Sequence, residues 1–106
     1  MRKIKPTRVI VTAPQFLNVK TLFDFFMKTL IKLGVKFEVK TYEEEISSIK
    51  MKGCIVEFWN VNKLKGKKCD LLIVDEAAGI PVHILFEMLN VSKRIIFSST
   101  IHGYEG

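Results

Sequence analysis

Cysteines and long apolar runs are both scarce in this sequence. Its 106 residues include only Cys54 and Cys69, which form no CxxC pair and have no His/Cys cluster near them. We therefore expect two free thiols rather than a disulfide or a zinc site. No apolar run is long enough to span a bilayer, and no signal-peptide apolar segment follows the basic start Met1–Pro6. These absences predict a soluble cytoplasmic protein that makes no contact with a membrane.

Apolar residues and positive charge are plentiful. Hydrophobic residues make up 48% of the chain, which excludes an intrinsically disordered protein and predicts one packed domain over residues 1–106. The net charge of +6 favours a polyanionic partner such as RNA. A lysine cluster in the expected loop 60–70 is open to two interpretations, an RNA contact or a solvated loop. The cluster comprises Lys63, Lys65, Lys67 and Lys68.

The first half of the chain predicts a strand, a helix and a second strand. Residues 7–13 are rich in β-branched side chains and end at Pro14, as a buried strand does. A helix is expected to begin at Asn18 as N-cap and to end at Gly34. Residues 35–40 alternate like a short strand, whereas residues 41–52 fit either a helix with a capping box or an irregular strand. The apolar stripe of the helix comprises Leu22, Phe23, Phe26, Met27, Leu30 and Leu33.

The second half predicts three more strands and one more helix. Residues 54–59 and 94–100 are expected to be strands, and the wholly apolar run 71–74 predicts a central parallel strand buried on both faces. A helix is expected to begin at Pro81. Its apolar stripe would comprise Ile84, Leu85, Met88 and Leu89. Alternating strands and helices predict an α/β fold, a three-layer sandwich with a mostly parallel sheet.

An acidic pair follows the apolar run 71–74. Ligands bind at the carboxyl edge of open α/β sheets, where Asp75 and Glu76 would lie. At such a position Asp75 would hold Mg²⁺, and Glu76 would orient or deprotonate an attacking water. The alternative for this short pattern is a strand followed by a solvated turn.

Three strand ends carry motifs in the order found in helicases. Val11–Pro14 looks like the motif that touches nucleic-acid phosphates, Asp75-Glu76-Ala77-Ala78 is a variant of the DEAD-type box, and Ser98-Ser99-Thr100 matches the Ser-Ala-Thr-type motif. Together the motifs resemble the helicase module of the tRNA(Met) cytidine acetyltransferases, a partial P-loop NTPase domain of the RecA-like helicase type. The resemblance covers nearly the whole chain, fits least over 35–51, and is most specific in the last segment. Its segments are Val11–Pro14, Asn18–Phe23, Leu72–Pro81 and Phe97–Gly106.

The resemblance implies an RNA-dependent ATPase module of an enzyme that makes N4-acetylcytidine in tRNA. ATP and Mg²⁺ would be bound by the intact module, and acetyl-CoA only by a separate acetyltransferase domain. Ser99 and Thr100 would couple nucleotide hydrolysis to RNA binding, and His102 would lie near the γ-phosphate or the RNA. Nucleic-acid phosphates would be contacted by the loop Thr12, Ala13 and Pro14. The alternative for the loop is a strand end broken by proline, and for Ser99 and Thr100 it is polar capping of a strand end.

The family's phosphate-binding motif, GxxxxGK[ST], occurs nowhere in the sequence, and the acetyltransferase domain is missing as well. We therefore expect a segment of a larger enzyme or a truncated relative that does not hydrolyse ATP alone. In this ATPase class the P-loop strand lies beside the strand matched here by Arg94–Thr100. Its absence predicts an apolar sheet edge at 94–100 and a homo-oligomer paired across that edge.

Three hypotheses stay open at this point. The leading one is a fragment of the ATP-binding, helicase-like module of a tRNA cytidine acetyltransferase, favoured by the presence of both Asp75 and Glu76. The second is a stand-alone, non-catalytic RNA-binding or scaffold protein, favoured by the lack of a P-loop. The third is an ordinary doubly wound domain in which the acidic pair is incidental.

Overall fold

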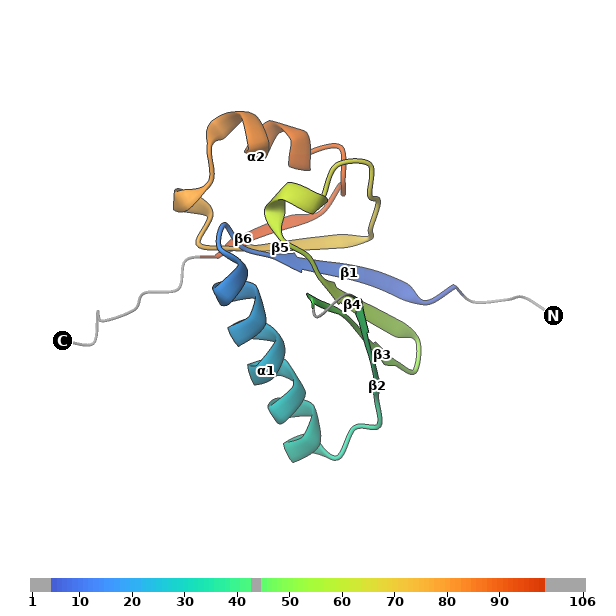
Figure 1. The fold of residues 1–106 in the computed structure, drawn as a ribbon. Helices are drawn as coiled ribbons and strands as arrows, with labels where there is room; N and C mark the ends of the chain where they lie inside the picture. The colour runs from blue at the N-terminus through green and yellow to red at the C-terminus, as the bar shows by residue number, and fades with distance from the viewer. Residues whose placement is uncertain (1–4, 43–44, 99–106) are drawn as a thin grey trace.

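One six-stranded sheet organises the chain, and the computed structural model describes residues 5–42 and 45–98. The strands are β1 (Thr7–Thr12), β2 (Glu38–Tyr42), β3 (Glu45–Met51), β4 (Cys54–Phe58), β5 (Leu71–Asp75) and β6 (Ile95–Ser98). The helices are α1 (Phe16–Leu33) and α2 (Val82–Met88), with single 3₁₀ turns η1 (Val61–Lys63) and η2 (Ala77–Gly79). Along the sheet the strands lie in the order β2-β3-β4-β1-β5-β6 (Figure 1).

The sheet is parallel over four strands and antiparallel at one side. β1 pairs in parallel with β4 and β5, and β5 pairs in parallel with β6. β3 pairs antiparallel with both β4 and β2. The mostly parallel sheet is thus confirmed, with β5 between two parallel neighbours as its apolar sequence predicts. The carboxyl ends of β4, β1, β5 and β6 consequently meet at one edge.

Two apolar cores lie on opposite faces of this sheet. Neighbouring strand residues such as Ile10 and Val11 point to opposite faces, so each face receives half of the apolar side chains. Helices α1 and α2 cover different faces (Figure 1), which confirms the three-layer α/β sandwich. The core under α1 comprises Val11, Ala13, Val19, Phe23, Leu30, Ile49, Val56 and Phe58. The core under α2 comprises Ile10, Leu64, Leu72, Val74, Ile80, Met88 and Val91.

The structure confirms the predicted carboxyl end of α1 but not its predicted amino end. Gly34 adopts the left-handed conformation at φ 74° and closes the helix as expected. The helix begins earlier than predicted, at Phe16, with Gln15 as an N-cap that makes no side-chain capping bond. Asn18 lies inside the first turn, where its amide hydrogen bonds to the carbonyl of Gln15. The carbonyl of Gln15 accepts hydrogen bonds from the amides of both Asn18 and Val19, so the helix already includes residue 18.

Up to Met51, the described residues of the stretch 41–52 are strand rather than helix, with Thr41 and Tyr42 at the end of β2 and Glu45–Met51 forming β3. β3 continues through Met51 and turns back into β4, and its register with β2 shifts between Lys40 and Thr41. The irregular-strand alternative is therefore confirmed, and the strand predicted at 35–40 begins only at Glu38. Pairing with β4 and β2 outweighs the local helix signal, because a strand that lies between two others satisfies its backbone on both sides.

Both predicted apolar stripes are only partly covered. Leu33 at the end of α1 and Leu89 after α2 are exposed, although each fits the spacing of its helix face. Periodicity identifies the face of a helix, but the packing partner decides how far along the helix that face is covered. No helix in the described part of the chain is long and apolar enough to cross a membrane.

Candidate functional site

Asp75 ends β5 at the carboxyl edge of the sheet and is almost wholly buried. The apolar run 71–74 holds it there rigidly, since Leu72 and Val74 have no exposed surface. Its Oδ1 accepts a hydrogen bond of 3.1 Å from the hydroxyl of Ser98 at the end of the neighbouring strand β6. The hydrogen bond joins the two strand ends whose motifs predicted a site. Ser98 itself was not among the predicted site residues, although the motif Ser98-Ser99-Thr100 pointed to it.

Glu76, the next residue, has a left-handed backbone. Its φ of 54° and ψ of 47° make it the one non-glycine residue with positive φ in the described segments. This conformation costs an L-residue roughly 1–2 kcal/mol, and such residues cluster at functional sites. It turns the chain out of β5 and directly into η2. The acidic pair is therefore held by a buried strand on one side and a tight turn on the other.

The Thr12–Pro14 loop lies beside this turn. A Cβ placed on Gly79 would be only 3.3 Å from Cγ of Pro14, so η2 and the loop are in close contact. Thr12 is fully buried, and its hydroxyl donates a hydrogen bond of 2.6 Å to the carbonyl of Trp59. Ala13 is equally buried. In this structure the side chains of Thr12 and Ala13 therefore shape the loop from within.

The other predicted nucleotide-site residues, Ser99, Thr100 and His102, lie outside the described residues. Their prediction rests on sequence alone. Ser98, the first residue of the motif Ser98-Ser99-Thr100, pairs with Asp75 and therefore lies at the carboxyl edge of the sheet, as predicted for this motif.

The donor set at this edge suits Mg²⁺ without amounting to a complete metal cage. No group of three or more His, Cys, Asp and Glu side chains comes together in the parts of the chain that the structure covers. Mg²⁺ in phosphoryl-transfer sites needs only one or two carboxylates, because waters and substrate phosphates supply its other ligands. The buried carboxylate of Asp75, oriented by Ser98, fits that requirement.

A polar network joins β1, β4 and the loop 60–70 on the α2 face. Two guanidinium nitrogens of Arg8 each donate a 2.8 Å hydrogen bond to the carboxylate of Glu57. The indole nitrogen of Trp59 donates to the same carboxylate at 2.7 Å, and Lys67 lies 4.1 Å from the centre of the indole ring. Trp59 is therefore held in place by Glu57, and Lys67 of the lysine cluster packs on its ring.

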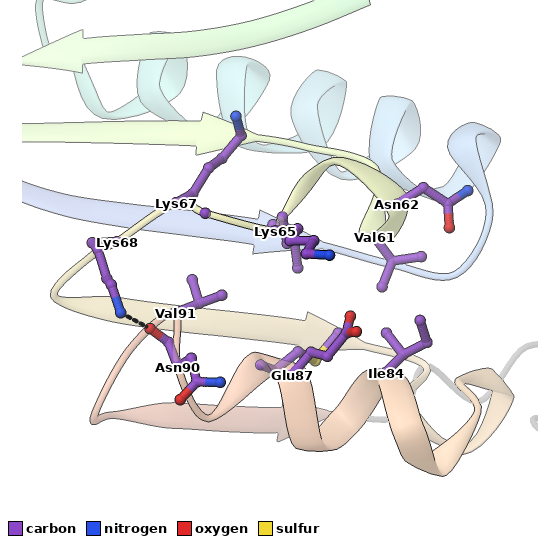
Figure 2. A pocket seen from close by; sticks show the side chains of 12 residues that line it. Val61, Asn62, Lys65, Lys67, Lys68, Ile84, Glu87, Asn90 and Val91 are labelled. Atoms are coloured by element: carbon purple, nitrogen blue, oxygen red, sulfur yellow. Dashed lines mark hydrogen bonds between the residues drawn. The ribbon is translucent and has the colours of Figure 1, made fainter.

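Lysines of the loop, Lys67 among them, line a groove next to α2 (Figure 2). The groove has a volume of about 410 Å³, and both Lys65 and Lys68 line it. Lys68 donates a hydrogen bond to the carbonyl of Asn90 across one end. Neither Asp75 nor Glu76 lines this groove, so it is separate from the acidic edge.

The two cysteines are free thiols, as expected. Burial raises the pKa of the Cys54 thiol. Burial also raises the pKa of Cys69, against hydrogen bonds that lower it. Both side chains are thus held as inert thiols rather than reactive thiolates at neutral pH.

Comparison of the fold with solved structures identifies ATPase domains. The large terminase of a thermophilic bacteriophage, in complex with ADP, superposes with a TM-score of 0.66 and 13% identity, covering 90% of this chain and 26% of that one. The ATPase domain of the large terminase from a Thermus phage gives a TM-score of 0.54 and 20% identity, covering 93% of this chain and 50% of that one. At this low identity the likeness shows the fold alone, that of a P-loop NTPase.

Comparison of the sequence is more specific. A family model for "RNA cytidine acetyltransferase NAT10/TcmA, helicase domain" matches residues 1–106. A tRNA(Met) cytidine acetyltransferase TmcA of Pyrococcus abyssi is 45% identical over 106 residues, covering 98% of this chain and 13% of that protein. An RNA cytidine acetyltransferase of Caenorhabditis elegans is 33% identical, covering 94% of this chain and 11% of that protein. The chain thus spans about one eighth of the length of these relatives, and it belongs to the helicase-domain family of the RNA cytidine acetyltransferases.

Proposed function

We propose that this chain is the part of an ATP-driven RNA-helicase module that carries the magnesium-binding and water-orienting residues. The module would serve a tRNA cytidine acetyltransferase that forms N4-acetylcytidine. The observation that carries the proposal is the acidic pair at the carboxyl edge of the sheet, with Asp75 oriented by Ser98 and Glu76 in a left-handed turn. Membership of the helicase-domain family and the ADP complex of a terminase with the same fold support it.

Each residue of the edge has a distinct role in this proposal. Asp75 holds Mg²⁺, which would neutralise the charge of the nucleotide phosphates when bound. Glu76 accepts a hydrogen bond from the attacking water and orients it. Ser99, Thr100 and His102 link the nucleotide to the RNA, and the loop at Pro14 contacts the RNA backbone. Acetyl-CoA would be bound elsewhere in the enzyme, and we expect the enzyme in the cytoplasm.

A second candidate is a non-catalytic RNA-binding or scaffold protein with the same fold. The sequence contains no GxxxxGK[ST] motif, so the backbone amides and the lysine that hold β- and γ-phosphates are not among its 106 residues. If no other chain supplied this phosphate-binding loop, any nucleotide that reached Asp75 would be bound only weakly. The basic surface alone would then account for binding to RNA.

The two candidates are separated by titrating the purified chain with a fluorescent ATP analogue, with and without Mg²⁺. We expect Mg²⁺-dependent binding that Asp75→Asn weakens by about tenfold, because asparagine keeps the size but not the charge of the metal ligand; this is about 1.4 kcal/mol. The matched control is Glu87→Gln on the exposed face of α2, which also removes one negative charge. Equal weakening by both substitutions, or binding that ignores Mg²⁺, would refute the assignment of Asp75.

We also infer that copies of the chain pair through β6. Only β5 pairs with β6 in the described sheet, so the other side of β6 is an edge. Its residues Ile96 and Phe97 are 50% and 51% exposed. Unpaired strand edges with apolar side chains tend to pair with another strand.

A further inference from the structure

A basic hollow lies at the opposite edge of the sheet from Asp75. Thr7 begins β1, Asp70 precedes β5 and Arg94 precedes β6, so the hollow is at the amino ends of three parallel strands. Its volume is about 880 Å³. The side chains that matter for its charge are Lys5, Lys68, Asp70, Lys93 and Arg94.

Positive charge in this hollow exceeds negative charge by far. Lys5, Lys93 and Arg94 are exposed, whereas the one carboxylate, that of Asp70, accepts a 2.8 Å hydrogen bond from the backbone amide of Arg8. Lys68 is held in place by its bond to the carbonyl of Asn90. Four cationic side chains therefore face one carboxylate that is already engaged. Positive charges gathered in a concave surface raise the local concentration of anions there.

The hollow continues into the groove beside α2. Both are lined by Lys68, Asn90 and Val91. The groove adds the cations Lys65 and Lys67 and one carboxylate, that of Glu87 (Figure 2). The positive charge thus forms a track from the amino edge of the sheet along α2 rather than a point. A track of cations suits a chain of phosphates, because each cation that neutralises a phosphate releases a counterion.

We propose that this hollow, which we call the amino-edge track, binds the phosphate backbone of RNA. The proposal takes RNA as the polyanion from the proposed function, but it requires neither ATP nor hydrolysis. The track is recessed, and a recessed surface cannot lie flat on anionic lipid headgroups as an interfacial helix does. RNA bound here would lie at the edge of the sheet opposite Asp75 and Glu76, separate from the Pro14 loop.

The test compares two triple variants in salt titrations of binding to a fluorescent single-stranded RNA oligonucleotide. The track variant is Lys5→Gln, Lys93→Gln and Arg94→Gln. The matched control is Lys20→Gln, Lys28→Gln and Lys36→Gln, exposed residues on or just after α1. Both variants lower the net charge of +6 by three, so any difference between them reports position rather than total charge.

We expect the track variant to lose about 2 in the slope of log affinity against log salt, at roughly 0.7 per phosphate contact. Between about 50 and 200 mM salt, the affinity of the unaltered chain should then fall roughly twentyfold more than that of the track variant. The control should keep the slope of the unaltered chain. Equal slopes for both variants would overturn the proposal.

Two more measurements complete the test. Asp75→Asn should leave the slope unchanged, so a failure of the ATP proposal would not be mistaken for a failure of this one. Circular dichroism should show that both triple variants remain folded. Binding to vesicles of phosphatidylserine and phosphatidylcholine that depends on Lys5, Lys93 and Arg94, without such dependence for RNA, would also overturn the proposal.

Discussion

At the residue scale, the acidic pair combines a rigid member with a strained one. Asp75 is buried in the last position of β5 and hydrogen-bonded to Ser98, whereas Glu76 has a backbone conformation that disfavours side chains. The strained position lies directly after the buried one, at the edge where the proposed chemistry takes place. The fold thus tolerates a local cost at the point where the chain leaves the sheet.

The strain at Glu76 can be measured by comparing two substitutions. Glu76→Gly should give a higher free energy of unfolding than Glu76→Ala by about 0.5–1 kcal/mol, because glycine accepts positive φ while alanine keeps the strain. Both lose the carboxylate, so the comparison isolates the backbone. Urea denaturation of the two variants is the measurement. A higher stability for Glu76→Ala would show that the left-handed conformation is not kept in solution.

At the scale of elements, one ion pair ties β1 to β4. The guanidinium of Arg8 and the carboxylate of Glu57 are 49 residues apart in sequence and make two hydrogen bonds on the α2 face. The hydrogen bond to Glu57 raises the pKa of Arg8. Burial alone would raise the pKa of Glu57, but hydrogen bonds from Arg8 and Trp59 outweigh it and lower that pKa. The ion pair therefore stabilises the fold only while Glu57 is ionised.

This dependence predicts how stability changes with pH. Because the pKa of Glu57 is lower in the folded than in the unfolded chain, its contribution is complete above the unfolded value of about 4.3 and is lost as the pH falls through the folded value. Glu57→Gln should lower the free energy of unfolding by about 1 kcal/mol at neutral pH, since the pair is partly exposed. The difference from the unaltered chain should shrink in acid.

Urea denaturation between neutral and acidic pH measures this difference. Glu38→Gln on the exposed strand β2 is the control for removing one negative charge. A Glu57→Gln deficit that stays constant as the pH falls would show that the loss comes from packing rather than from the charge.

At the scale of the whole molecule, the two edges of the parallel strands differ in charge. The carboxyl edge presents Asp75 and Glu76, and the amino edge presents the cations of the amino-edge track. The side of the sheet at β6 is apolar instead. The nucleotide would accordingly use the carboxyl edge, and a second copy of the chain would use the side at β6. RNA would use both the Pro14 loop and the amino-edge track.

The inferred pairing through β6 predicts a dimer at high concentration. Phe97→Lys should shift the chain toward monomer, because a charge on an edge strand opposes strand pairing. Phe86→Lys is a matched control, since Phe86 is 65% exposed on α2 and away from the strand edge. Size-exclusion chromatography with light scattering reports the mass. A monomer at high concentration, or equal effects of the two substitutions, would contradict pairing through β6.

Local patterns in the sequence determined the classes of element and the place of the acidic pair. The apolar run 71–74 predicted a buried parallel strand, Gly34 the end of α1, and the alternation of elements the three layers. These features could be predicted because they depend on periodicity and on the conformational freedom of single residues. The position of Asp75 at a strand end follows from the same local pattern.

Tertiary structure alone decided which distant residues meet. It made residues 45–51 a strand between β2 and β4, turned the hydroxyl of Thr12 toward Trp59, and joined Ser98 to Asp75. It also gathered Lys5, Lys93 and Arg94 in one hollow. None of these contacts has a local signal, because strand order and register are set by packing and pairing between segments far apart in the chain.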